Sequence, residues 1–375
     1  MTVTDDPPLA TGYWSDGDDP GDRRFLDIGP LELERGGRLP ALRLAYETWG
    51  RLAPDGANAV LVEHALTGDS HVVGPAGRGH PSPGWWDGLV GPRHAIDTEQ
   101  LFVVAANVVG GCQGSTGPSS IAPDGQRWGS RFPFLTIRDQ VEAERRLADV
   151  LGIERWALVI GGSMGGMRVL EWAVTHPEQV TRAAVLASTA AATADQIAWS
   201  QPQLLAIRDD PDFASGDYYD TGRRPVRGLG LARRIAHITY RSALELDERF
   251  GRAPQAGEDP LGSAGRYAVE SYLDHHADKL ERRFDANSYL VLTEAMNSHD
   301  LGRGRGGIAS ALARIKAQVT VVAVDSDRLY QRSQSEQLRD GIAGAQLHGI
   351  HSRHGHDGFL IEVPAVGRLV RDLLR

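Results

Sequence analysis

Several features that would point to export or to a membrane are scarce or absent in this sequence. The 375 residues include a single cysteine, Cys112, so an intramolecular disulfide is impossible, as is typical of a reducing compartment. No run of 18 apolar residues could cross a bilayer. The N-terminus has no basic segment followed by an apolar one, so a secretory signal is not expected. These absences favour a cytoplasmic protein without a membrane partner.

Basic clusters are missing as well. Lys and Arg number 40 against 49 Asp and Glu, which gives a net charge of −9, and no Lys/Arg block interrupts this acidic balance. Nucleic acid and anionic membranes are therefore poor candidates as partners. Residues 1–22 are acidic and rich in Gly and Pro, so we predict a mobile N-terminal tail there.

The rest of the chain predicts an α/β fold with an insertion. Short apolar runs alternate with helical patterns, which is typical of a mostly parallel sheet flanked by helices. The expected strands lie at 42–50, 58–68, 101–111, 156–160, 182–188 and 318–327, and the expected helices at 136–153, 167–176 and 367–375. Residues 191–300 are mostly amphipathic and helical. We therefore predict a core domain of residues 23–190 and 301–375, with a helical lid of residues 191–300.

The segment Gly161-Gly162-Ser163-Met164-Gly165 matches the pattern G-x-S-x-G. It follows an apolar strand and precedes a helical run, which is the context in which this pattern presents a serine nucleophile. The glycines would let neighbouring backbone approach a strained strand-to-helix turn without Cβ clashes. A close-packed glycine turn or a phosphate cradle is the alternative, although the P-loop lysine and the dinucleotide spacing are missing.

A serine nucleophile needs a base and an orienting acid, which follow it in this chain order in such folds. Asp325 and Asp327 end the last predicted strand, and Asp327 is favoured because it lies in the loop just beyond. The segment "HSRHGHDGF" supplies the histidines, of which His356 is favoured over His354 because glycines flank it. The alternative for this His cluster is a metal site, but the spacing is not that of H-E-x-x-H, and no second cluster supplies further ligands.

The developing oxyanion needs backbone N–H donors. We expect Met164, directly after the nucleophile, to supply one, and Leu66 in the turn "EHALTGDSH" to supply the other. The alternative for the Leu66 segment is a simple surface turn.

Several blocks together resemble the homoserine O-acetyltransferase family of methionine biosynthesis. They are "HALTGDSH", "GWWDGLVGP", "NVVGGCQGSTGPSS", "GSRFPFLTIRDQV", "GGSMGGM", "ARRIAHITYR", "SDRLY" and "GHDGF", in this order from about residue 25 to the C-terminus. The resemblance implies an α/β-hydrolase core with a helical lid. It also implies transfer of the acetyl group from acetyl-CoA, a substrate rather than a cofactor, to the hydroxyl of L-homoserine.

The resemblance assigns roles to individual residues. The nucleophile falls on Ser163, the acid on Asp327 and the base on His356. The substrate-binding arginine and tyrosine of the family lie seven residues apart, which selects Arg233 and Tyr240.

The family's substrate aspartate, next to the catalytic histidine, falls on Asp357. A homodimer joined through the lid helices is also implied, with no metal and no further cofactor. The family usually has a proline after "SDRLY", where this chain has Gln331.

Other functions stay open at this stage. A succinyl-CoA-dependent transferase, or one that acts on serine, would need only a different pocket around the same serine. A plain esterase or thioesterase would use water as the acceptor. A non-enzymatic binding protein is disfavoured because it has no need of a serine, an acid and a histidine together.

Overall fold

An eight-stranded sheet lies at the centre of the computed structural model, which describes residues 12–262 and 264–375. The strand order is β1-β4-β8-β5-β9-β10-β11-β12; the pairings of β4 with β1 and β8 are antiparallel and the other five are parallel. The strands are β1 (Arg24–Asp27), β4 (Arg43–Trp49), β5 (Ala59–Glu63), β8 (Phe102–Ala106), β9 (Leu158–Gly162), β10 (Arg182–Leu186), β11 (Gln318–Val324) and β12 (Gln346–Ile350). The predicted mostly parallel sheet is therefore confirmed.

Two small sheets and both edge strands of the main sheet, β1 and β12, were not expected from the sequence. The small sheets pair β2 (Leu31–Glu32) with β3 (Arg38–Leu39) and β6 (Val90–Gly91) with β7 (Ile96–Asp97). The edge strand β12 reads QLHGI and is only partly buried, so it lacks the continuous apolar run of the inner strands.

Alternate residues of the inner strands face two separate apolar cores, as the strand period of two requires. Val159 and Val321 belong to one core, whereas Leu158 and Val322 belong to the other. The first core is covered by α1 (Ile137–Leu151), α2 (Met164–Thr175), α8 (Ile308–Leu312) and α9 (Arg332–Gly341), and the second by α10 (Gly358–Ile361) and α11 (Val363–Leu374).

Local sequence signals set the ends of the helix predicted at 136–153. Thr136 and Asp139 form a reciprocal capping box at the start of α1. Gly152 ends the helix in a left-handed conformation at φ 72°.

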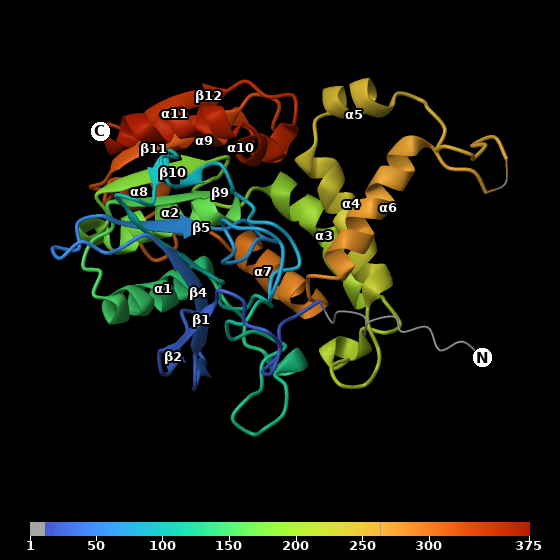
Figure 1. Cartoon of the computed structure of the whole chain (residues 1–375), viewed down its shortest axis with the longest axis horizontal. Helices are drawn as coiled ribbons and strands as arrows, with labels where there is room; N and C mark the ends of the chain where they lie inside the picture. Colours follow the sequence, from blue (N-terminus) through green and yellow to red (C-terminus); the bar gives the residue numbers. More distant parts are fainter. Residues whose placement is uncertain (1–11, 263) are drawn as a thin grey trace.

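The lid connects β10 to β11 and folds over the carboxyl ends of the strands. It contains α3 (Ala194–Arg208), α4 (Val226–Tyr240), α5 (Ala243–Phe250), α6 (Ala268–Glu281) and α7 (Ala286–Asn297). In Figure 1, α3 to α6 lie to the right of the sheet, and α7 lies nearer to it. A third apolar cluster joins the two parts, with Leu66 and Met164 from the core beside Leu229 and Leu292 from the lid. Short 3-10 turns complete the chain: η1 (Gly129–Arg131), η2 (Pro177–Gln179), η3 (Ala214–Gly216) and η4 (Gly355–Asp357).

The N-terminal segment differs from the prediction where the structure describes it. Residues 1–11 of the predicted mobile tail lie outside the described residues. From residue 12 onward the chain contacts the body: the Trp14 N–H donates to the Cys112 carbonyl at 2.9 Å, and the Trp14 ring stacks on Phe25. Apolar aromatic surface in an otherwise acidic stretch explains this contact.

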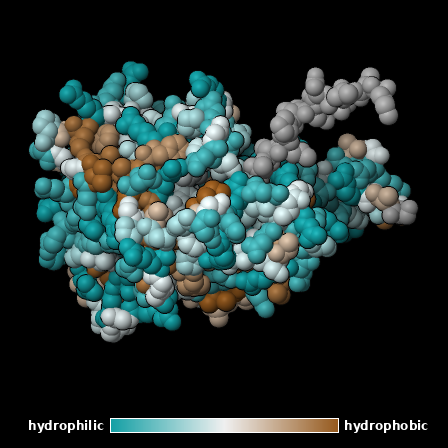
Figure 2. Space-filling view, turned by 90° about the horizontal axis from the view of Figure 1, so that it is seen from below, coloured by the Kyte–Doolittle hydropathy of each residue, from teal (hydrophilic) through white to brown (hydrophobic). Residues whose placement is uncertain are grey.

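The surface seen from below is largely hydrophilic (Figure 2). Its hydrophobic residues gather mainly over the core, on the left, rather than over the lid on the right. In the part of the chain that the structure describes, no helix is long and apolar enough to cross a membrane.

Candidate active site

Ser163 lies at the sharp turn between β9 and α2, at the carboxyl end of the parallel strands. Its backbone is strained, with φ 58° and ψ −123°, in a region that non-glycine residues rarely adopt. The Ser163 N–H donates to the Leu186 carbonyl of β10 at 3.0 Å, which anchors the turn. The side chain is 6% exposed and faces a narrow cavity of about 40 Å³ under the lid.

Each glycine around Ser163 has a packing reason. A Cβ at Gly162 would lie 2.3 Å from the Phe359 ring, and one at Gly165 would lie 2.2 Å from the Glu63 carbonyl oxygen. Cβ atoms at Gly161 and Gly166 would also meet neighbouring atoms at 2.5–2.8 Å. Four glycines therefore let β9, α2 and the neighbouring strands pack closely enough to present one hydroxyl.

His356 and Asp327 form a buried pair. The His356 Nδ1 lies 2.7 Å from Asp327 Oδ2, while Asp327 Oδ1 accepts the N–H groups of Leu329 and Tyr330 at 2.8 and 2.9 Å. Both carboxylate oxygens are thus occupied, and the imidazole is held in one orientation. The Nε2 atom of His356 is buried and has no hydrogen-bond partner among the described residues, which leaves it available to a substrate or to Ser163.

The competing candidates have other partners. Asp325 lies 2.5 Å from the Nδ1 of His351, whose side chain is 98% exposed, and His354 faces Glu245 at 3.3 Å. The three histidines therefore contact three different carboxylates, which is not the arrangement of a metal site. Of the two acids and three histidines, the structure therefore brings together Asp327 and His356, the two favoured from loop position.

Tyr330 contacts both Ser163 and His356 and was not singled out from the sequence. Its ring stacks on His356 at a centroid distance of 4.9 Å, and its phenol is a hydrogen-bond partner of the Ser163 side chain. Phe359 packs edge-on against His356. The only sequence signal for Tyr330 was its position three residues after Asp327, in the block "SDRLY".

The surroundings of His356 predict a specific pH dependence. Burial opposes protonation, but the charge and hydrogen bond of Asp327 outweigh it, and the pKa of His356 lies above its usual 6.5. Since only the neutral imidazole can act as a base, kcat/KM for acetyl-CoA should rise with pH through a midpoint above 6.5. A pH series of initial rates measures this midpoint, and a value below 6.5 would contradict the electrostatic argument.

The two expected oxyanion donors lie beside the serine. Met164 is the first residue of α2, so its N–H has no acceptor inside the helix. Leu66 lines the same cavity as Ser163, and its N–H donates to no other described residue.

Arg168 holds the start of the Leu66 turn. It is fully buried on α2, donates to the His64 carbonyl at 2.6 Å and pairs with Glu63 and Glu144 at 2.8 and 2.7 Å. Helix α2, which begins directly after Ser163, is thereby joined to the turn that carries Leu66.

The predicted substrate residues lie in two neighbouring cavities. Tyr240 lines the Ser163 cavity and its ring centre lies 5.9 Å from that of His356. The Arg233 guanidinium lies over the Tyr240 ring, 5.4 Å from its centre. Arg233 and Asp357 line a second cavity of about 130 Å³ between α4, α6 and η4. Asp357 directly follows His356 in the chain, and Tyr240 connects the two cavities, since it lines the first and contacts Arg233 of the second.

The second cavity is strongly cationic. It is lined by Arg233, Arg241, Lys279 and Arg283, whereas Asp357 is the one acid among its described lining residues. His237 and His276 also line it; burial, with Arg233 nearby, lowers their pKa values to about 2 and 3, so both are neutral. The Arg233 Nε is buried and unpartnered among the described residues. The cavity therefore suits a small ligand with a negative group.

The sequence reasoning missed Arg241 and Arg283 in this cavity. Arg241 lies 3.4 Å from Asp357, and Arg283 donates to the Thr67 carbonyl at 2.7 Å. Burial raises the pKa of Asp357, although Arg241, His356 and Arg233 oppose that shift. Arg241 directly follows Tyr240 and ends the block "ARRIAHITYR", which could have marked it, whereas no local pattern marks Arg283.

Comparison with known proteins gives consistent results. A family model described as the alpha/beta hydrolase fold matches residues 58–360, which confirms the predicted fold class. The chain is 64% identical over 372 residues to the homoserine O-acetyltransferase of Thermobifida fusca (strain YX), with 98% of each chain covered. It is 54% identical over 355 residues to the homoserine O-acetyltransferase of Mycobacterium tuberculosis (strain CDC 1551 / Oshkosh), covering 94% of this chain and 93% of that one.

Solved structures with the same architecture include both transferases and esterases. The homoserine O-acetyltransferase from Bacillus anthracis has a TM-score of 0.86 at 27% identity, covering 94% of this chain and 97% of that chain. Esterase E22 has a TM-score of 0.86 at 26% identity, covering 94% and 99%. Overall shape therefore does not separate the two activities, whereas sequence identity favours the transferases.

Proposed function

Because this chain belongs to the homoserine O-acetyltransferase family of the α/β hydrolase fold, we propose that it transfers the acetyl group of acetyl-CoA to the hydroxyl of L-homoserine. The reaction is a step of methionine biosynthesis. The observation that carries the proposal is the position of Tyr240, which lines the Ser163 cavity while the Arg233 guanidinium of the cationic cavity lies over its ring.

In the first half-reaction, Ser163 takes the acetyl group. His356 Nε2 accepts the Ser163 proton while Oγ attacks the thioester carbonyl carbon. The N–H groups of Leu66 and Met164 bind the oxyanion, and Asp327 stabilises the imidazolium. The C–S bond then breaks, the CoA sulfur takes the proton from His356, and an acetyl-serine remains.

In the second half-reaction, homoserine replaces CoA. Its carboxylate binds to Arg233, its ammonium group to Asp357, and its side-chain hydroxyl reaches His356 beside Tyr240. His356 takes the hydroxyl proton, the oxygen attacks the acetyl carbonyl, and the bond to Ser163 breaks as Oγ recovers the proton. The lid above the narrow Ser163 cavity restricts the entry of water.

Arg233→Gln tests the acceptor site. Loss of a charged hydrogen bond of about 1.5–3 kcal/mol should raise the KM for homoserine roughly 10- to 100-fold and leave the KM for acetyl-CoA nearly unchanged. Steady-state kinetics with each substrate varied in turn measures both values.

Arg234 supplies a matched control for this variant. It neighbours Arg233 on α4 but pairs with Asp274 at 2.8 Å, away from the cavity. Arg234→Gln should leave both KM values within a factor of about three, as for a surface change. Equal effects of the two variants on homoserine would remove Arg233 from the acceptor site.

A plain acetyl esterase is the second candidate, because solved structures of this architecture include an acetylester hydrolase from Corynebacterium glutamicum with a TM-score of 0.82 and 28% identity. The cationic cavity favours the transferase, since water as acceptor has no carboxylate to bind. A transferase that uses succinyl-CoA as donor or serine as acceptor would need the same catalytic residues but a pocket of different size around the substrate.

We further propose a cytoplasmic homodimer that uses the lid helices as its contact. Large apolar side chains are exposed on α3, α4 and α5, among them Ile197, Leu205, Leu231 and Leu244, each at least 40% exposed. Such side chains on a helical surface are available for burial against a second copy. The single thiol, Cys112, is buried, in keeping with a reducing location.

A further inference from the structure

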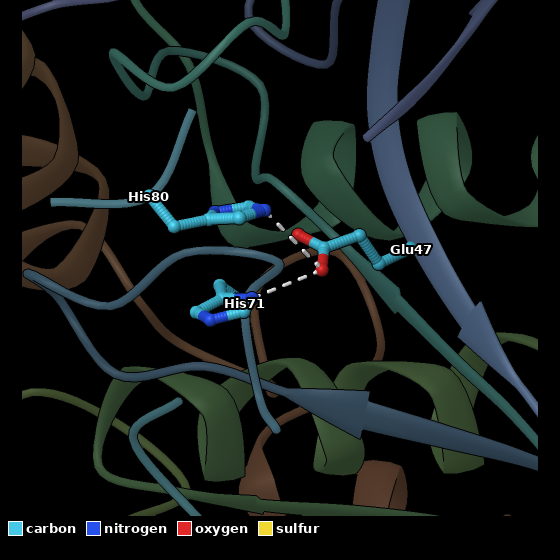
Figure 3. A group of neighbouring side chains, drawn as sticks. All are labelled: Glu47, His71 and His80. Atoms are coloured by element: carbon cyan, nitrogen blue, oxygen red, sulfur yellow. Dashed lines mark hydrogen bonds and ion pairs between the residues drawn. The ribbon is translucent and has the colours of Figure 1, made fainter. Parts of the chain in front are cut away.

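Glu47, His71 and His80 form a buried charge cluster outside the catalytic pair. Glu47 lies on β4, and the two histidines come from the long loop that follows β5; each residue is at most 4% exposed. The imidazole rings are stacked, with centroids 3.7 Å apart and planes at 10°. Figure 3 shows both rings presenting a nitrogen to the Glu47 carboxylate.

The hydrogen bonds indicate the charge of each member. His71 Nδ1 lies 3.1 Å from Glu47 Oε2 and its Nε2 lies 3.3 Å from the Pro75 carbonyl, so both ring nitrogens face acceptors and both donate. His80 Nε2 lies farther from Glu47 Oε2, at 3.7 Å, and accepts the Asp22 N–H at 3.4 Å, which requires a lone pair there. His71 is therefore an imidazolium paired with ionised Glu47, and His80 is a neutral ring stacked on it.

The other charges near the cluster fit this assignment. Asp69 on the same loop adds negative charge near His71, and Arg23 adds positive charge near His80. Burial opposes protonation of His71, but Glu47 outweighs it and raises the pKa of His71, while burial lowers the pKa of His80.

The three side chains could also be taken for a metal site, because their ligand atoms lie within 4.8 Å of one another. The ring geometry argues against this. Imidazole lone pairs lie in the ring plane, and two parallel stacked rings cannot both direct them at one ion between the planes. The Asp22 N–H also occupies the Nε2 of His80.

This cluster anchors the C-terminal end of the Leu66 turn, residues 63–71. Glu47 Oε1 accepts the Ser70 hydroxyl at 2.7 Å and Oε2 pairs with His71, so one carboxylate fixes two consecutive turn residues. The near end is fixed by Arg168 on the His64 carbonyl. Leu66 lies between these two buried anchors, so both contribute to the direction of its N–H.

We propose that Glu47 and protonated His71 are positioning residues that hold the Leu66 turn in its oxyanion-binding shape, and that loss of the His71 proton limits activity at alkaline pH. The inference rests on the proposed oxyanion role of Leu66. The direction of the pH effect follows from the ion pair between Glu47 and His71. The ion pair stabilises the turn fully below the ordinary histidine pKa, and this stabilisation is lost as pH rises through the raised pKa of His71. The loss of activity at acid pH has a separate cause, which is the protonation of His356.

The test is the pH profile of the p-nitrophenyl acetate burst, which requires only the nucleophile and the oxyanion hole. Rates of the Ser163→Ala variant are subtracted at each pH. The wild-type burst rate should fall at alkaline pH. Glu47→Gln should move this fall to lower pH, and His71→Gln should abolish it, with a burst rate at neutral pH about tenfold lower, since loss of a full oxyanion donor costs 10²–10³.

Two controls separate this role from others. His351→Gln removes an exposed histidine and should leave the whole profile unchanged. Thermal unfolding of each variant, measured at each pH of the series, shows whether a lower rate comes from lost structure.

An alkaline limb that is the same in wild type, Glu47→Gln and His71→Gln would overturn the inference. So would one Zn²⁺ bound per chain by wild type and lost in His80→Gln, since a metal would displace the His71 proton. Failure of the proposed acetyl transfer would appear elsewhere, as acetyl-CoA turnover that ignores homoserine while the burst remains.

Discussion

Ser163→Ala should lower kcat for acetyl transfer by about 10⁵-fold or more, because the variant has no oxygen to carry the acetyl group and the triad acts as a unit. The fold should survive, since alanine removes only a hydroxyl and keeps the N–H that donates to Leu186. Mass spectrometry after exposure to acetyl-CoA should find an added acetyl group on the wild-type protein and none on the variant.

Ser310→Ala gives the background for this comparison. Ser310 is an exposed residue of α8, and its loss should leave turnover within a factor of about two, as for other surface changes. Near-normal turnover of Ser163→Ala would end the acyl-enzyme scheme altogether.

Asp327→Asn should lower kcat by about 10⁴-fold, because it changes the tautomer of His356. The asparagine oxygen can still accept the Leu329 and Tyr330 N–H groups at the Oδ1 position. Its NH₂ group then faces His356 Nδ1, which must accept instead of donate. The proton moves to Nε2, and the base that should receive the Ser163 proton is blocked.

The neighbouring carboxylate makes this prediction specific. Asp325→Asn changes a partly exposed residue paired with an exposed histidine, so its cost should stay within a few-fold. Stopped-flow acylation with acetyl-CoA measures both variants. If Asp325→Asn cost as much as Asp327→Asn, the acid would be misassigned.

The core and the pairing of Asp327 with His356 could be predicted because their signals are local. The strand before Ser163, the glycines around it and the loop after β11 each lie within a few residues, and the chain order of serine, acid and histidine is fixed by the fold. The α/β core followed from apolar runs that are buried on both faces of a parallel sheet.

The remaining parts depend on contacts between distant segments. Arg283 reaches the Thr67 carbonyl across 216 residues of sequence, and Glu47 meets His71 from a strand that was predicted only as part of the sheet. The half-exposed strand β12 has no apolar run to mark it. Such features follow from the packing of the lid and the loops, which single-sequence periodicity does not encode.

The most direct test of acetyl transfer is the release of free CoA thiol from acetyl-CoA by the purified protein, with and without L-homoserine. The account predicts slow release alone and a large, saturable increase on addition of homoserine, with O-acetyl-L-homoserine formed in equal amount. Rapid release that does not change with homoserine would contradict it and identify a hydrolase, and the acceptor roles of Arg233 and Asp357 would then be lost.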